Sequence, residues 1–467
     1  MEFFEVIKRD PDSTARLGVI HTAHGQVHTP AFLPIGTRGS VKAVTSEELR
    51  FWGAEMILAN TYHLWLRPGD ALINKAGGLH KFMGWEGPIF TDSGGYQVYS
   101  LGEKQDLSLR GNPKQSNSEI AALRGARNDR QNENAPILKR ITEAGVEFRN
   151  ELDGNLQILT PEQSIQIQSN LGSDIAVALD DVPGLPAPMK RLESSLDLTL
   201  KWAGRARKQF DKIRSQSLNP GQRLFAVVQG GDDETLRKKC VKALEKIGFD
   251  GCAIGGLAIG AVADNPEIMY RVISFTIPHL DPSKPRHLLG VGYPEQIIKA
   301  IGLGLDTFDC VIPTRNARHG QLFINKKPGD SVIARSTLRP VRHSFVTIRS
   351  PWAKEVSEGG SNPTGSPRPL GSSLGARDDN NYGYQIINIL NKQYREDFTP
   401  VDNTCSCYGC LHHNRAYLRH LFMSGEPLGI RLATMHNLRF YLDLMEKIRR
   451  SIEYESFAEL QKIYVGK

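Results

Sequence analysis

The sequence predicts an α/β protein: a closed (β/α)8 barrel of the TIM type with a zinc-binding subdomain near the C-terminus. Short apolar segments alternate with amphipathic segments in a regular order, which is typical of parallel βα units. About seven or eight such apolar segments occur, and this number favours a closed barrel over an open doubly wound sheet. No G-x-G-x-x-G fingerprint opens a helix after the first strand, which argues further against the open sheet.

The composition is that of a large folded chain with a modest basic excess. The 467 residues are 40% hydrophobic, carry a formal net charge of +7 and have a pI near 9.0. A basic surface fits a polyanionic partner, although an excess this small also fits ordinary surface charge. No apolar run approaches the length of a membrane span, and the N-terminus lacks the pattern of a signal peptide. The cysteines form no disulfide framework, so we expect a protein of the reducing cytoplasm.

The first 40 residues are expected to form extended ribbon. Turn residues separate four short segments with strand character. The segments cover residues 3–7, 15–21, 25–30 and 31–35.

The barrel units follow in order. Capping boxes predict helices starting after Thr45 and Thr160, the second with proline at the first helical position. Amphipathic segments predict further helices over 189–214, 234–247, 266–278 and 294–302. The strands between them are expected at residues 55–59, 88–91, 175–179, 224–228, 251–254, 287–289 and 308–312.

We therefore predict a single barrel domain over residues 1–467, with N-terminal antiparallel strands and two irregular insertions. Residues 103–136 are polar and lose apolar periodicity, and residues 326–384 include a flexible stretch rich in Gly, Ser and Pro. A zinc-binding subdomain is expected over 385–440 and a C-terminal helical segment over 441–467.

Polar side chains follow most of the predicted barrel strands. Barrel enzymes hold their chemistry at the carboxyl ends of the strands. A structural explanation would need several unrelated buried carboxylates, each with its own partner, whereas one shared active site explains them together. The residues at these ends are Asn60, Asp92, Asp180, Gln229, Gly255, Gly256 and Asp309.

The stretch around Asp309 reads as a buried strand over 308–312 that Pro313 stops, followed by a loop carrying Arg315 and Arg318. A buried carboxylate must be paired, hydrogen-bonded or used in chemistry. Neighbouring arginines favour an anionic ligand such as a phosphate backbone. The alternative is a structural Asp–Arg pair.

The C-terminal segment contains a metal-binding motif. Cys405, Cys407 and Cys410 form C-x-C-x-x-C, and His436 lies on a later amphipathic segment, which together make a closed Cys3His zinc set. Four protein ligands leave no position for water, so we predict one structural zinc ion per subunit. Competing candidates for the fourth ligand are His412, His413 and His420.

Several motifs in order resemble those of the tRNA-guanine transglycosylases. The resemblance covers nearly the whole chain outside the two insertions. The motifs are Asn60-Thr61-Tyr62-His63-Leu64, Asp92-Ser93-Gly94-Gly95-Tyr96-Gln97, Val228-Gln229-Gly230-Gly231, Gly255-Gly256-Leu257-Ala258, Phe308-Asp309-Cys310-Val311, Pro313-Thr314-Arg315 and the cysteine cluster.

The resemblance implies a zinc-bearing barrel that exchanges the guanine at the tRNA wobble position for a 7-deazaguanine base. It implies the tRNAs for Asp, Asn, His and Tyr as substrates. It also implies a dimer, formed either with a second copy or with a non-catalytic relative, in which one subunit acts on one tRNA at a time.

Site roles follow from the same resemblance. Asp309 matches the nucleophile that forms a covalent bond to the ribose, and Asp92 matches the general acid/base. Asn60 and Gln97 would hold Asp92 in its resting state. The RNA contacts implied are Thr314, Arg315 and Arg318.

The base would be read by Asp180 and Gln229 at its guanine-like edge, because a carboxylate accepts both the N1–H and the exocyclic amine. Gly256 would address the carbonyl of the base, and Tyr96 and Leu289 would form apolar walls. The full set of substrate-binding residues implied is Asn60, Ser93, Tyr96, Gln97, Asp180, Gln229, Gly255, Gly256, Leu257 and Leu289.

Two positions depart from the bacterial pattern. Asp181-Val182 stands where Asp180 is usually followed by Glu-Cys, and this resembles the eukaryotic form that accepts the bulkier base queuine. Ala261 stands where bacterial enzymes have a Glu that supports the aminomethyl group of 7-aminomethyl-7-deazaguanine. We therefore expect either base, with direct use of queuine as a hypothesis.

Other function classes remain. A non-catalytic tRNA-binding partner subunit need not keep both Asp92 and Asp309, which this chain has. A base-exchange enzyme of the archaeal type usually adds C-terminal RNA-binding domains, and an enzyme acting on DNA is a further variant. A zinc-dependent hydrolase would need an open metal position, which the closed ligand set does not provide.

Overall fold

The computed structural model describes residues 2–96, 138–258, 265–326 and 383–465. The chain divides into two compact units. One comprises Met1–Ile312 with Leu444–Ala458, and the other comprises Pro313–Asp443 with Glu459–Lys467. Among the described residues, no helix is both long and apolar enough to cross a membrane.

The first unit is built on one parallel sheet. Its short strands consist mainly of buried apolar residues, as expected for strands covered on both faces. Its nine strands are β4 (Ala31–Leu33), β5 (Ile35–Gly36), β6 (Ile57–Ala59), β7 (Ile89–Thr91), β11 (Ile175–Val177), β12 (Arg223–Val228), β13 (Gly251–Ile254), β14 (Arg286–Leu288) and β15 (Thr307–Asp309).

The sheet curls into a nearly closed barrel. Its order is β4-β15-β14-β13-β12-β11-β7-β6-β5, and its two edge strands are separated in the chain only by Pro34. β4 pairs in parallel with β15 and β5 pairs in parallel with β6, while the Pro34 carbonyl accepts the Leu58 N–H at 3.0 Å. β4 and β5 are thus two halves of one interrupted strand, and the predicted (β/α)8 fold class is confirmed.

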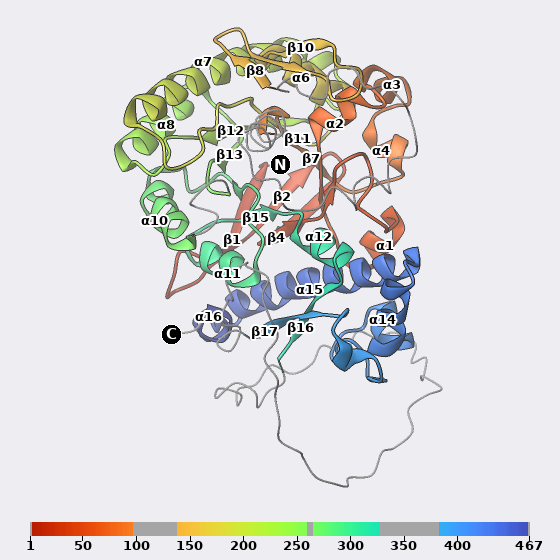
Figure 1. The fold of residues 1–467 in the computed structure, drawn as a ribbon. Helices are drawn as coiled ribbons and strands as arrows, with labels where there is room; N and C mark the ends of the chain where they lie inside the picture. The colour runs from red at the N-terminus through yellow and green to blue at the C-terminus, as the bar shows by residue number, and fades with distance from the viewer. Residues whose placement is uncertain (1, 97–137, 259–264, 327–382, 466–467) are drawn as a thin grey trace. The chain divides into compact units, whose positions relative to one another are not determined.

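Helices surround the strands (Figure 1). The predicted capping box at Thr45 is present, and Thr160 caps the helix that ends at Gly172, whose φ of 70° is the left-handed conformation that glycine tolerates. The helices of this unit are α1 (Ser46–Phe51), α2 (Thr61–Leu66), α3 (Asp70–Lys75), α4 (Leu79–Met83), α6 (Pro161–Leu171), α7 (Met189–Ile213), α8 (Glu234–Ile247), α10 (Pro266–Thr276) and α11 (Pro294–Gly302), with 3-10 turns η2 (Arg214–Gln216) and η3 (Ile277–His279).

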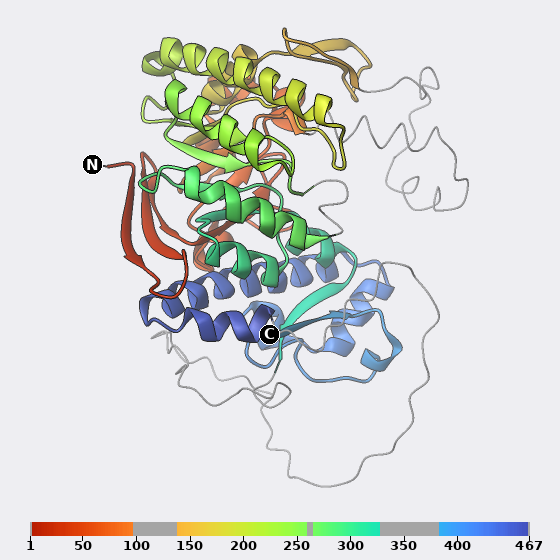
Figure 2. The ribbon, with the colours of Figure 1, turned by 90° about the vertical axis from the view of Figure 1, so that its left-hand side faces the viewer.

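An antiparallel sheet of β1 (Phe4–Arg9), β2 (Arg16–Thr22) and β3 (Gly25–Thr29) covers one end of the barrel (Figure 2). It contributes Phe4, Ile20 and Val27 to the same buried cluster as the inward-facing barrel residues. The fully buried Arg16 guanidinium binds the Asp306 carboxylate with two hydrogen bonds of 2.8 and 2.7 Å. This pair ties the N-terminal sheet to the start of β15.

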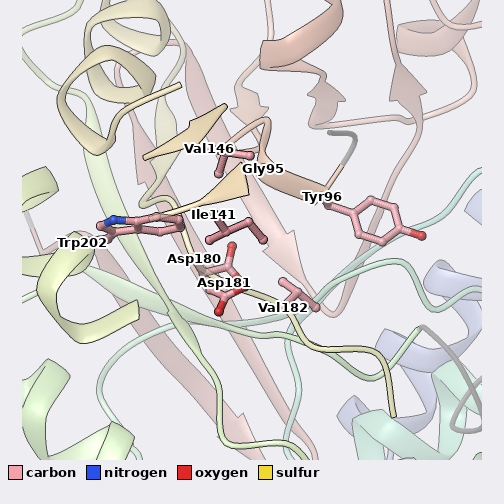
Figure 3. Close-up of a pocket in the computed structure, with 8 residues that line it drawn as sticks. All are labelled: Gly95, Tyr96, Ile141, Val146, Asp180, Asp181, Val182 and Trp202. Atoms are coloured by element: carbon pink, nitrogen blue, oxygen red, sulfur yellow. The ribbon is translucent and has the colours of Figure 1, made fainter. Parts of the chain in front are cut away.

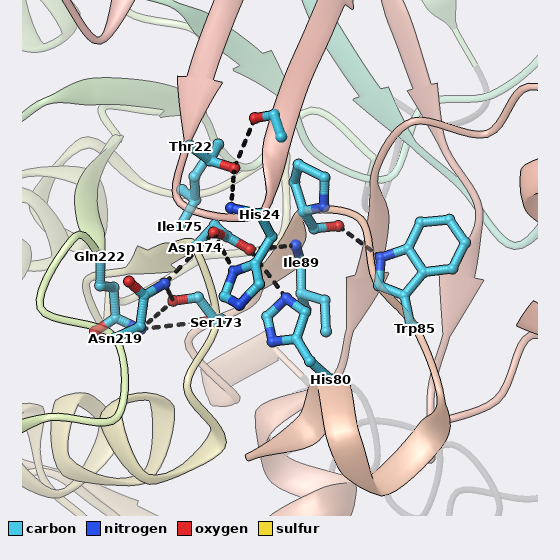
Figure 4. Close-up of polar contacts among 12 residues, drawn as sticks. Thr22, His24, His80, Trp85, Ile89, Ser173, Asp174, Ile175, Asn219 and Gln222 are labelled. Atoms are coloured by element: carbon cyan, nitrogen blue, oxygen red, sulfur yellow. Dashed lines mark hydrogen bonds and ion pairs between the residues drawn. The ribbon is translucent and has the colours of Figure 1, made fainter. Parts of the chain in front are cut away.

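Asp174 makes a second connection at this end (Figure 4). His24 Nδ1 lies 2.8 Å from Oδ1, and Oδ2 accepts the Ile89 N–H at 2.8 Å and lies 3.2 Å from His80 Nε2. Burial acts to raise the pKa of Asp174, but the hydrogen bonds from both histidines outweigh it and lower the pKa to about 2. Backbone and imidazole donors thus occupy both oxygens, and Asp174 connects the β2–β3 turn, α4 and β7.

A second antiparallel sheet joins β8 (Leu138–Ile141), β9 (Val146–Arg149) and β10 (Leu156–Leu159) between β7 and β11 in the chain. The predicted insertion 103–136 lies outside the described residues.

The prediction for residues 308–312 is wrong at its C-terminal half. β15 ends at Asp309, and a helix, α12 (Ile312–Arg318), replaces the expected strand end and arginine-bearing loop. The reason is the position of Pro313, the second residue of α12. Proline in the first helical turn loses no hydrogen bond and has a suitable φ, so it starts a helix as readily as it stops a strand.

The second unit contains a two-stranded sheet and several helices. Phe323 packs between the rings of Tyr384, Phe440 and Tyr441, with centroids 5.2 to 5.9 Å from its own. Most of the predicted insertion 326–384 lies outside the described residues, and the boundaries predicted at 385–440 and 441–467 stay predictions. The further elements are β16 (Gln321–Asn325), β17 (Tyr384–Asn388), η5 (Lys392–Tyr394), α13 (Tyr408–His412), α14 (Arg415–Met423), α15 (Pro427–Glu453) and α16 (Phe457–Val465).

Candidate active site and metal centre

The predicted site residues of the barrel gather at the carboxyl ends of its strands. Because the strands are parallel, these ends all lie at one end of the barrel, opposite the end where the strands begin. Asp309 is the last residue of its strand. Each of the other predicted site residues lies one to three positions after the last residue of its own strand. The residues and strands are Asn60 after β6, Asp92 after β7, Asp180 after β11, Gln229 after β12, Gly255 and Gly256 after β13, and Asp309 in β15.

Asp92 is held by α2. The side chain of Asn60 caps this helix by accepting the His63 N–H at 3.0 Å, and its amide NH2 donates to Asp92 Oδ2. The backbone N–H of Thr61 donates to Asp92 Oδ1 at 2.9 Å. The cap thereby fixes the orientation of the Asn60 amide, and these two donors to the carboxylate are both neutral.

Asp180 and Gln229 form a buried pair. Gln229 Nε2 donates to Asp180 Oδ2 at 2.7 Å, whereas the buried Gln229 Oε1 has no hydrogen-bond partner among the described residues. Burial raises the pKa of Asp180 to about 7, the Gln229 hydrogen bond partly opposes this increase, and the Asp181 charge adds to it. The site therefore holds a carboxyl that titrates near neutrality beside an unsatisfied acceptor, as a polar ligand would require.

Gly255 makes room for this pair. A Cβ built on Gly255 would lie 2.4 Å from Gln229 Nε2, closer than atoms can approach. Gly256 follows with a φ of 78°, the left-handed region that favours glycine, and a Cβ there would lie 3.1 Å from Gln229 Oε1. These two glycines let the backbone after β13 pass directly against the amide of Gln229.

A pocket opens beside Asp180 (Figure 3). Asp180, Asp181 and Val182 lie in its middle, and Tyr96, with 43% of its surface exposed, lies to one side. Asp181 is engaged in a two-pronged ion pair with Arg191 at 2.5 and 2.8 Å, so it is a structural carboxylate. The lining residues are Gly95, Tyr96, Ile141, Val146, Asp180, Asp181, Val182 and Trp202.

Asp309 is held from the neighbouring strand. His287 Nε2 lies 3.0 Å from Asp309 Oδ1, and the Gly290 backbone N–H donates to the same oxygen at 3.1 Å. His287 was not predicted as a site residue. A histidine inside an apolar strand gives no signal by itself, because the register that places it opposite Thr307 is known only from the sheet.

Arg237 is a second residue that the sequence did not reveal. It belongs to the amphipathic helix α8, where an arginine is expected on the solvated face, yet it is fully buried. Its guanidinium donates to the carbonyls of Gly231, Val228 and Gly255 at 2.9, 2.7 and 2.9 Å. Burial lowers the pKa of Arg237 to about 10. Through these hydrogen bonds Arg237 connects the ends of β12 and β13, which Gln229, Gly255 and Gly256 follow.

The remaining predicted residues are placed as follows. Ser93 is buried and its Oγ accepts the Gly95 N–H at 3.4 Å, Leu257 is buried, and Leu289 packs against the barrel core. Gln97 and Ala261 lie outside the described residues. On α12, Thr314 is buried, whereas Arg315 and Arg318 are exposed.

The four predicted metal ligands of the second unit lie together. The sulfur atoms of Cys405, Cys407 and Cys410 and one ring nitrogen of His436 are all within 4.8 Å of one another. His436 Nδ1 lies 3.3 Å from Cys410 Sγ. The competing candidates His412, His413 and His420 are not in this cluster.

The donor set fits a metal ion. His436 Nε2 lies 2.7 Å from the carbonyl oxygen of Phe323, an acceptor, so Nε2 carries the proton and the Nδ1 lone pair faces the thiols. The backbone N–H groups of Cys407 and Cys410 donate to Cys405 Sγ and Cys407 Sγ, both at 3.4 Å, which stabilises thiolates. Three sulfurs and one imidazole nitrogen are the ligands of a closed tetrahedral zinc site.

Comparison with known proteins gives one consistent family. The model of the family "Queuine tRNA-ribosyltransferase" matches residues 10–120 and 129–467. A protein named queuine tRNA-ribosyltransferase from Caldanaerobacter subterraneus subsp. tengcongensis is 39% identical over 464 residues, which is 99% of this chain and 97% of the relative. Relatives with the same name from Pasteurella multocida and Vibrio atlanticus are each 39% identical and cover 94% and 96% of this chain, and 88% and 92% of their own lengths.

The geometry around Asp180 predicts an unusual titration. The Asp180 carboxyl is protonated below a pH of about 7 and ionised above it. Because the Gln229 amide stabilises the ionised form, Gln229→Leu should raise this pKa further. Carbon-13 NMR of aspartate-labelled protein measures the titration, with Asp180→Asn identifying the signal. A wild-type titration near the ordinary aspartate value, or an unchanged value in Gln229→Leu, would contradict the interpretation.

Proposed function

The chain belongs to the queuine tRNA-ribosyltransferase family of tRNA-modifying glycosyltransferases, and we propose that it exchanges the wobble guanine of tRNA for a 7-deazaguanine base. The observation that carries this proposal is the set of Asp92, Asp180 and Asp309 at the carboxyl ends of three strands of one barrel. Asp309 suits the displacement at the ribose, Asp92 suits the proton transfers, and Asp180 suits recognition of the base.

The exchange runs in two displacements. A stacked base is out of reach, so the guanosine must first be extruded into the site. The Asp309 carboxylate then bonds to C1′ of the ribose as the glycosidic bond breaks, and Asp92 gives its proton to the departing guanine. The incoming base next loses a proton to Asp92 and attacks C1′, and this attack releases Asp309. Asn60 and Thr61 orient Asp92 in the resting site, before substrate binds.

Base recognition rests on Asp180 and Gln229. The ionised Asp180 carboxylate accepts the N1–H and exocyclic amine of a guanine-like edge, and this binding favours ionisation near neutral pH. Gly256 N–H serves the base carbonyl, while Tyr96 and Leu289 form the walls. Ser93, Gln97, Gly255 and Leu257 complete the predicted site.

The tRNA partners in this proposal are those for Asp, Asn, His and Tyr, bound through Thr314, Arg315 and Arg318. The enzyme works as a dimer, with itself or with a non-catalytic relative. A non-catalytic partner subunit remains the second candidate function, and it is disfavoured because both Asp92 and Asp309 carry organised hydrogen bonds.

The Cys3His cluster is proposed to hold one structural zinc ion. Cys405, Cys407, Cys410 and His436 would fill its coordination, so the ion contributes folding stability and leaves no position for water or substrate.

The covalent step is tested by trapping. Wild-type enzyme and tRNA should give an adduct that survives denaturation, and Asp309→Asn should abolish it and lower exchange on the order of 1,000-fold or more. Asp232→Asn, a change at an exposed carboxylate, is the matched control and should keep the adduct. An adduct that persists in Asp309→Asn would remove Asp309 as the nucleophile.

Zinc content tests the metal proposal. Elemental analysis should find one zinc per chain in the wild type and much less in Cys410→Ala, together with a lower melting temperature. Cys240→Ala alters a buried thiol outside the cluster, so it should lose stability while keeping its zinc. Full zinc occupancy in Cys410→Ala would exclude this ligand set.

The choice of base is tested by incorporation. We propose that queuine is accepted directly, because Val182 lines the pocket next to Asp180 with a small apolar surface. Val182→Phe should narrow the pocket and reduce incorporation of queuine more than that of 7-aminomethyl-7-deazaguanine. A strong wild-type preference for the aminomethyl base would overturn the proposal.

A further inference from the structure

We propose that His287 is the positioning residue for the nucleophile: it fixes one oxygen of Asp309, Oδ1, and thereby leaves Oδ2 to form the bond to the ribose. This inference rests on the proposed role of Asp309 and extends it to a second residue and to a single carboxylate oxygen. Residues of three barrel strands, β7, β14 and β15, hold the imidazole in place.

The pairing of β14 with β15 places His287 beside the nucleophile. In this parallel pair His287 lies opposite Thr307, and Leu288 lies opposite Phe308. Thr307 and Asp309 are two residues apart in β15, so their side chains point to the same face. The imidazole spans both, with Nδ1 at 2.9 Å from Thr307 Oγ1 and Nε2 at 3.0 Å from Asp309 Oδ1.

The ring is held on one face as well as at its edge. His287 is fully buried, and the Phe90 ring from β7 stacks on it with centroids 4.6 Å apart and planes 29° apart. Phe90 itself belongs to the packed barrel core and meets Phe225 edge-on. The imidazole therefore cannot turn without disturbing the core.

The partners of the ring define its proton. An ionised Asp309 oxygen only accepts hydrogen bonds, so Nε2 must carry the proton that faces it. In the neutral ring Nδ1 is then an acceptor, and the Thr307 hydroxyl donates to it. Thr307 thus selects the tautomer that His287 needs to hold Asp309.

A second donor strengthens the same orientation. Gly290 has a φ of 73°, and its N–H donates to Asp309 Oδ1 at 3.1 Å. Within the described parts of the chain, both hydrogen bonds to this carboxylate end on Oδ1 and none ends on Oδ2. The Asp309 side chain keeps 10% of its surface exposed, whereas His287 keeps none. The held oxygen is stabilised and less nucleophilic, so Oδ2 is the oxygen that attacks.

The experiment measures how fast the covalent adduct forms in a single turnover. His287→Phe preserves an aromatic ring of similar bulk and removes the donor, so adduct formation should slow about 100-fold, the scale expected for a misplaced reacting group, while tRNA affinity stays unchanged. His287→Gln supplies an amide N–H and should recover part of the loss. Thr307→Val should slow the step less than His287→Phe, because it affects only the tautomer.

A merely structural role predicts a different pattern. If His287 were only structural, His287→Phe would lower the melting temperature, and the folded variant would form the adduct at the wild-type rate. Alternatively, His287→Gln would form the adduct as slowly as His287→Phe. Either result for the rate of adduct formation would overturn the proposal. Crystal structures of the wild type and His287→Phe separate this question from the proposed function. If the wild type formed no adduct, the proposed function would fail. An Asp309 carboxylate that keeps its wild-type orientation in His287→Phe would refute positioning in either case.

Discussion

The structure depends on one constraint: a carboxylate inside a barrel needs hydrogen-bond donors, and the kind of donor decides what it can do. At the end where the strands begin, Asp306 is bound by the guanidinium of Arg16 and Asp174 by two histidines and a backbone N–H. Removing one partner of such a buried ion pair typically costs about 3–5 kcal/mol. At the other end, the described donors to Asp92, Asp180 and Asp309 are amides, an imidazole and backbone N–H groups. The first arrangement neutralises the carboxylate, and the second orients it while keeping it reactive.

The two buried aspartates that flank β11, Asp174 and Asp180, illustrate the difference between these two kinds of hydrogen-bond partner. Asp174 precedes the strand and Asp180 follows it, so the same short segment carries both. The hydrogen bonds from His24 and His80 overcome the effect of burial and lower the pKa of Asp174 to about 2. Asp180 has neutral hydrogen-bond partners, chiefly the Gln229 amide, and these do not outweigh burial, which raises its pKa to about 7. For these two aspartates the charged partners lie at the end where the strands begin, and the neutral amide lies at the end that carries the candidate active site.

The sequence predicts well those features that follow from local pattern. Strand ends carry Asn60, Asp92, Asp180, Gln229 and Asp309 because apolar runs stop there, and parallel topology alone places these ends together. It fails where a side chain acts across the fold: His287 depends on strand register, and Arg237 depends on a helix face that receives three carbonyls. The error at Pro313 has a local cause, since proline fits a first helical turn as well as a strand end. A single sequence does not show which residues far apart in the chain contact one another in the fold.

The two histidines of greatest interest follow one physical rule. An imidazole has two nitrogens, and anchoring one of them determines what the other presents. His436 donates its Nε2–H to the Phe323 carbonyl and so presents an Nδ1 without a proton to the thiols. His287 accepts from the Thr307 hydroxyl at Nδ1 and so presents an Nε2–H to Asp309. When a hydrogen-bond acceptor binds one ring nitrogen, the other nitrogen has a free lone pair and can bind a metal. When a hydrogen-bond donor binds one ring nitrogen, the other nitrogen carries the proton and can donate to a carboxylate. Exchanging the anchor types would give each histidine the wrong proton for its partner, which makes Thr307 and the Phe323 carbonyl part of their respective sites.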